Sequence, residues 1–160
     1  MSEIAEAATA TIVLADHAAV DAANKVNLLG AGWTITQIIQ TGATAPHAVV
    51  VFIDVPAKFY GQTVPVSLML LDDAGRPVEP PGNPPIRVAQ LAKVERPQLP
   101  GIYLPEDLPA RIQVVMAFPM GIPLERGRKY KWQLEIDSAS KPDWETWFCV
   151  AGPPPQPVIG

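Results

Sequence analysis

Short apolar runs separated by turn residues are the dominant pattern along this chain. Residues 9–16 and 26–29 are rich in β-branched and apolar side chains, and the polar stretch 21–25 between them predicts a turn and therefore a hairpin. Residues 47–55 are almost entirely apolar, which is typical of a central strand that is covered on both faces. We expect that strand to stop at Pro56.

The second half of the chain repeats this pattern. Residues 64–71 lead into a turn at 72–77, which contains Asp, Gly and Pro and predicts a further hairpin. Residues 86–94 and 111–118 are two more strand candidates. Between them, residues 97–109 contain four prolines and predict an extended surface loop.

The last two predicted strands are residues 130–136 and 144–150. In the first of them, apolar and polar residues alternate, which is the pattern of a strand with one buried face and one wet face. Upstream, Leu124-x-x-Gly127-x-x-Tyr130 resembles the tyrosine corner of immunoglobulin-like sandwiches, in which a tyrosine hydroxyl bonds to backbone earlier in the chain.

Gly30 and Gly32 precede residues 33–39, in which apolar and polar side chains also alternate. The two glycines predict a bulge or bend within one long strand. The alternation places Trp33, Ile35 and Gln37 on one face and the threonines on the other.

Nineteen prolines and eleven glycines are spread along the 160 residues. They argue against long helices, because a proline inside a helix costs about 3 kcal/mol. Eight or nine short strands separated by turns predict a single-domain, all-β antiparallel β-sandwich, immunoglobulin-like or jelly-roll-like. We expect an N-terminal arm at residues 1–8, the sandwich at 9–151 and a proline-rich C-terminal arm at 152–160.

Charged residues make up 18% of the chain and apolar residues 48%, so much of the surface must be neutral. The net charge is −4, and the basic residues are scattered apart from a small cluster at 126–131, so we expect no nucleic-acid partner. No apolar run is long enough to span a membrane, and Glu3 and Glu6 stand where a signal peptide would be basic. We therefore expect a protein that is made in the cytoplasm and does not bind membranes.

The sequence contains no recognisable catalytic or cofactor motif. His17 and His47 stand outside any nucleophile motif, and Cys149 lies in an apolar run that predicts a buried, inert thiol. Asp72 and Asp73 are adjacent but match no calcium-loop pattern, so a solvated hairpin tip is the simpler interpretation. We expect no enzyme activity, no metal and no cofactor.

Both ends of the chain add length without core periodicity. The proline-rich C-terminal end is expected to be a stiff, extended arm, which can lie along a neighbouring subunit at low entropic cost. We therefore predict that the arms bind a protein partner. The predicted partner-binding residues are Ile4, Pro153, Pro154, Pro155, Pro157, Val158 and Ile159.

Residues 12–20 (IVLADHAAV) and 25–33 (KVNLLGAGW) carry an LAD…V…KVNLLG-type signature. This signature resembles the opening of small uncharacterised bacterial and actinobacteriophage proteins, in which it begins a β-sandwich. The resemblance covers about the first third of the chain and brings no catalytic residues with it. It implies a non-enzymatic domain and is compatible with a phage virion.

These features favour a non-enzymatic structural or interaction protein. Within that class we expect a phage virion component, either a capsid decoration protein or a minor capsid protein, that docks onto a protein lattice or onto other copies of itself. The alternative is a cytoplasmic ligand- or carbohydrate-binding sandwich. It would use Trp144 or Trp147, one of which must face outward if their strand alternates.

Overall fold

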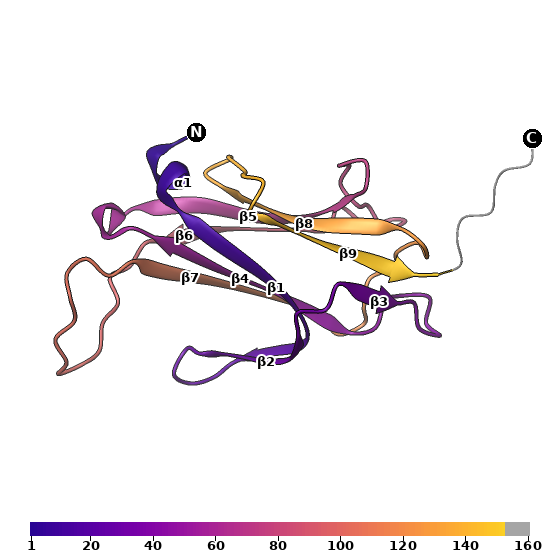
Figure 1. Cartoon of the computed structure of the whole chain (residues 1–160), viewed down its shortest axis with the longest axis horizontal. Coiled ribbons are helices and arrows are strands. Elements are labelled where there is room, and N and C mark those ends of the chain that lie inside the picture. The colour runs from indigo at the N-terminus through magenta and orange to yellow at the C-terminus, as the bar shows by residue number, and fades with distance from the viewer. Residues whose placement is uncertain (153–160) are drawn as a thin grey trace, which may run out of the picture.

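The computed structural model describes residues 1–152 and contains nine strands in two packed sheets (Figure 1). The first sheet has the order β2 (Val26–Ala31), β1 (Thr9–Val20), β4 (His47–Val55) and β7 (Ala110–Phe118). The second has the order β3 (Ile35–Gln37), β9 (Glu145–Ala151), β8 (Lys129–Ile136), β5 (Thr63–Asp72) and β6 (Arg87–Lys93). Two short helical elements are α1 (Glu3–Ala7) and η1 (Ala57–Phe59). The prediction of an all-β sandwich with eight or nine strands is confirmed.

The strand connections are immunoglobulin-like. β1, β4 and β7 are neighbours in one sheet, and β9, β8, β5 and β6 are neighbours in the other, which is the arrangement of strands A, B, E and G, F, C, C′. The predicted tyrosine corner is present, because the backbone N–H of Glu125 donates to the Tyr130 hydroxyl at 3.0 Å. Burial of this side chain raises the pKa of Tyr130.

The two sheets face each other through rows of alternating inward side chains. In β8, Trp132, Leu134 and Ile136 are fully buried, while the residues between them face outward. In β4, Val49, Val51 and Ile53 form the opposing row and are also fully buried. The predicted alternation of the 130–136 strand is therefore the alternation between core and solvent.

The outer face of β4 is covered by the β1–β2 hairpin. β1 pairs with β4 through its first half and with β2 through its second half, and the hairpin folds over the sheet. Ala18 packs with Ala48 and Val50 in a second apolar cluster. At the hairpin tip, the Gln113 side chain of β7 donates to the carbonyl oxygen of Asn24 at 3.1 Å. This cover explains why β4 is apolar on both faces.

The segment after β2 corrects one prediction. Gly30 and Gly32, with φ of +62° and +86°, lie where the chain crosses from the first sheet to the second, and not in a bend of one long strand. β3 is only three residues long and pairs in parallel with β9. Ile35 and Gln37 share a face as predicted, but that face is the outer one, and Ile35 is 61% exposed while Thr36 is 8% exposed.

The N-terminal residues do not form a free arm. The Ser2 hydroxyl accepts a hydrogen bond from the N–H of Ala5 and caps α1. Ile4 is 7% exposed within the main core, and Nζ of Lys141 donates to the carbonyl oxygen of Ala8 at 3.0 Å. Ile4, predicted to bind a partner, therefore packs against its own chain, because the single helical turn directs it inward. Among residues 1–152, no helix is long and apolar enough to cross a membrane.

Candidate functional site

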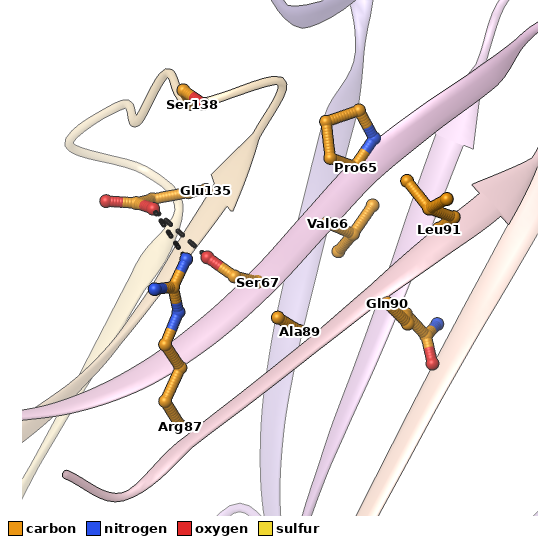
Figure 2. Close-up of a pocket in the computed structure, with 9 residues that line it drawn as sticks. All are labelled: Pro65, Val66, Ser67, Arg87, Ala89, Gln90, Leu91, Glu135 and Ser138. Carbon is orange, nitrogen blue, oxygen red and sulfur yellow. Dashed lines mark hydrogen bonds and ion pairs between the residues drawn. The ribbon is translucent and has the colours of Figure 1, made fainter.

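An open hollow lies on the outer face of the second sheet, beside its edge strand β6 (Figure 2). Three strands and the loop that follows β8 contribute to it. The lining residues are Pro65, Val66, Ser67, Arg87, Ala89, Gln90, Leu91, Glu135 and Ser138. The hollow therefore combines apolar side chains with a polar group.

The polar group consists of three side chains from three strands. The Ser67 hydroxyl donates to Oε2 of Glu135 at 3.0 Å, and Nη2 of Arg87 lies 3.9 Å from the same oxygen (Figure 2). Ser67 is buried, whereas the Arg87 side chain is 49% exposed. The guanidinium has five N–H donors, so it can bind a further acceptor such as a carboxylate.

The apolar part of the hollow is formed by Pro65, Ala89 and Leu91. Pro65 pairs with Leu91 and Ser67 pairs with Ala89 across the two strands, so all four side chains share the outer face of the sheet. Leu91 is 75% exposed. A ligand lying along β6 would bury this side chain.

β6 also offers backbone groups, because among residues 1–152 only β5 pairs with it. Just beyond the strand, the N–H of Val94 donates to the carbonyl oxygen of Gln62 in the segment leading into β5. Backbone direction alternates along an antiparallel strand, so Ala89 and Leu91 point their N–H and C=O groups away from β5. Pro65 fits this register, since the position opposite Leu91 directs no N–H toward β6.

The structure places the two candidate sugar-binding tryptophans differently. Trp144 is fully buried in the core. Trp147 faces outward, but Nζ of Lys129 and Nζ of Lys131 lie 4.5 Å and 5.1 Å from its ring centroid. Its indole N–H donates to Oε1 of Glu145 at 3.1 Å. These contacts occupy the ring that a sugar would need for stacking, so neither tryptophan offers an open platform.

His47 is a buried structural side chain. It is 3% exposed, and its Nδ1 lies 3.0 Å from the carbonyl oxygen of Ala45 and 3.4 Å from the hydroxyl of Thr44. Burial lowers the pKa of His47, because the charged ring would lose its hydration. Within residues 1–152, no three or more His, Cys, Asp or Glu side chains are grouped so that they could hold a metal ion.

The turn after β5 is the hairpin tip that the sequence predicts. The backbone N–H groups of Arg76 and Ala74 donate to Oδ1 of Asp72, which lowers the pKa of the Asp72 carboxyl. The carboxylate thus holds the turn together. Cys149 differs from its prediction, because it is only partly buried and lies on the outer face of the second sheet, opposite Lys129.

The predicted C-terminal docking residues lie outside the described residues. They are Pro153, Pro154, Pro155, Pro157, Val158 and Ile159. Their role stays a prediction.

Sequence reasoning found the strand at 86–94 but missed the hollow and the open edge. The order of strands in a sheet depends on pairing across the whole chain, which a local pattern does not contain. A local signal does exist, because Arg87 and Lys93 place charges at both ends of β6, and charged residues are typical of edge strands.

Comparisons with protein-family models, with curated proteins and with solved structures found no match. The resemblance of residues 12–20 and 25–33 to bacterial and actinobacteriophage proteins therefore stays a prediction.

Proposed function

We propose that this protein is a non-enzymatic interaction module that binds an extended segment of a partner protein along the open edge of β6. The observation that carries this proposal is the outward backbone of Ala89 and Leu91 beside the hollow. Strand addition of this kind uses main-chain hydrogen bonds for affinity and pockets for alternate side chains for selectivity. An edge with both elements supports this mode of binding.

The side chains around β6 favour a particular partner sequence. Leu91, Ala89 and Pro65 favour an apolar side chain on the face of the partner strand that meets the hollow. Arg87 lies four residues from Leu91 on the same face, and its half-exposed guanidinium favours a carboxylate. Because residues four apart share one face of a strand, we expect the partner to carry an apolar and an acidic residue four positions apart.

Selection from a random peptide library against the purified protein tests this mode of binding. Selected peptides should bind wild type, and Ala89→Pro should weaken their binding at least about tenfold by removing one main-chain hydrogen bond and obstructing the edge. Hydrogen exchange should show new protection at the Ala89 and Leu91 amides when a peptide is bound. Peptides that bind Ala89→Pro as well as wild type would contradict the proposal.

Two leucines provide a matched control for the side-chain contribution. Leu91 and Leu29 are 75% and 69% exposed, and each lies on an edge strand, but of different sheets. Leu91→Ser should weaken peptide binding, whereas Leu29→Ser should leave it unchanged. Equal effects of the two substitutions would argue for nonspecific apolar contact.

The setting proposed for this binding is a virion, with the protein acting as a capsid decoration or minor capsid protein. The N-terminal resemblance supports this setting, and a capsid lattice would present many identical partner segments. Mass spectrometry of gradient-purified parent particles should find the chain in many copies. Its absence, or its presence in only a few copies, would contradict the virion setting. The binding at β6 would not be contradicted, because the peptide experiment tests it separately.

A further inference from the structure

A second concave surface lies at β3, the other edge strand of the second sheet. We call it the β3 groove. Its apolar surface is formed by Trp33, Ile35, Ile39 and Pro46, and Ile35 and Ile39 are 61% and 39% exposed. Among residues 1–152, the lining has one carboxylate, Asp16, and no lysine or arginine. The groove is therefore suited to an uncharged, apolar occupant.

The chain itself continues from the border of this groove. Ala151 of β9 pairs with Gln37 of β3, and Gln37 lines the groove. Figure 1 shows the end of β9 beside β3. Eight residues follow Gly152, with the sequence PPPQPVIG, and none of them has a charged side chain.

The chemistry of this segment matches the groove. Proline-rich segments favour the polyproline II conformation and dock into aromatic-lined grooves with little loss of conformational entropy. Trp33 supplies an aromatic ring, while Ile35 and Ile39 offer apolar contact to Val158 and Ile159. Burial of a segment without charged side chains also avoids the cost of desolvating such a side chain.

The direction in which the chain leaves β9 favours a groove on a different molecule. A Cβ on Gly152 would lie 2.5 Å from the Cβ of Arg126, so the chain leaves β9 against the segment that leads into β8. β9 lies between β8 and β3, and the groove is on the β3 side, away from β8.

We infer that residues 153–160 of one copy occupy the β3 groove of a second copy. The exit of the segment and the groove lie at the same edge of the sandwich, so a twofold-symmetric pair exchanges two segments and fills both grooves. This self-association uses β3 and is separate from the partner binding at β6.

A mixing experiment with two full-length variants tests this inference. Val158→Asp together with Ile159→Asp alters the segment, and Ile35→Asp together with Ile39→Asp alters the groove. In sedimentation velocity, wild type should form dimers, and each variant alone should dimerise at least about tenfold more weakly because it loses both apolar contacts. The mixture should form one-to-one heterodimers, since one intact segment then meets one intact groove.

The inference is overturned if wild type stays monomeric, if either variant dimerises like wild type, or if the mixture stays monomeric. Thermal unfolding checks that the variants fold, and Ile39→Ser replaces the groove variant if the aspartates destabilise it. Leu91→Asp is the control for an aspartate on an exposed edge strand, because it places one on the opposite edge of the same sheet and should leave dimerisation unchanged. Ala89→Pro should also dimerise normally, which separates a failure at β6 from a failure at β3.

Discussion

β4 and β6 are strands of the same sandwich with opposite surroundings. β4 lies between β1 and β7, its outer face is covered by the β1–β2 hairpin, and residues 48–51 are at most 1% exposed. Within residues 1–152, β6 pairs with β5 alone, and its Leu91 is 75% exposed. A strand with two neighbours and two covered faces has its backbone and side chains engaged in the fold, whereas an edge strand keeps half of its backbone groups free for a partner.

The largest expected effect is a loss of stability when a buried side chain of β4 is truncated, compared with an exposed one of β6. Ile53→Ala in β4 removes most of a fully buried side chain and should lower the free energy of unfolding by about 2–5 kcal/mol. Leu91→Ala in β6 should lower it by less than about 0.5 kcal/mol, because that side chain is mostly in water already. Urea unfolding measures both values. Similar losses for the two variants would contradict the difference in burial between β4 and β6.

A proline pair sharpens the comparison within β6. Gln90→Pro removes an N–H directed at β5 and should destabilise the protein by about 1–3 kcal/mol through the unpaired acceptor in β5 alone. Ala89→Pro removes an N–H directed at solvent and should cost clearly less. Thermal unfolding of both variants ranks the two costs. Equal costs would contradict the backbone direction inferred for β6.

The start of β4 should respond to pH. Burial lowers the pKa of folded His47 below its ordinary value of 6.5, so the unfolded chain binds more protons in the interval between the two values. The stability that neutral His47 contributes should be complete above about pH 6.5 and should decline as the pH falls toward the folded-state pKa. Urea unfolding between pH 5 and 8 measures this slope. His47→Phe should flatten it.

The smallest effect is expected from the ion pair that joins β4 to β7. Nε and Nη2 of Arg111 each donate to the Asp54 carboxylate at 2.7 Å, but the side chains are 57% and 32% exposed. Water and salt screen such a pair, so Arg111→Gln should cost less than about 1 kcal/mol, and less still at high salt. Urea unfolding at two salt concentrations checks this. A larger, salt-independent loss would mean that Arg111 contributes through packing.

The strands that could be predicted are those whose pattern is local. Residues 47–55 form β4 with the predicted bounds, and the alternation at 130–136 marks β8 to within one residue. The 9–16 strand extends to Val20, because residues 17–20 pair with β2. Side-chain pattern identifies a strand reliably where one neighbouring layer decides burial.

Features that depend on distant partners could not be predicted. β3 pairs with β9, which lies more than 100 residues later in the chain. The glycines before β3 permit a crossing between the sheets, and in the sequence they look like a bulge. The burial of Ile4 in the core was not predicted, because a helix of five residues has no measurable periodicity. The hollow beside β6 combines residues from β5, β6 and β8, so it exists only after the sheet has formed.

Loop tips are usually the places where a chain accepts inserted residues, because little else depends on them. The tip of the β1–β2 hairpin is an exception, since the carbonyl oxygen of Asn24 is held by the side chain of Gln113. An insertion there would break this hydrogen bond to β7, beside the apolar cluster that contains Ala48 and Val50. This exposed turn thus helps to hold the hairpin over a buried apolar surface, and a peptide tag inserted in it would disturb that contact.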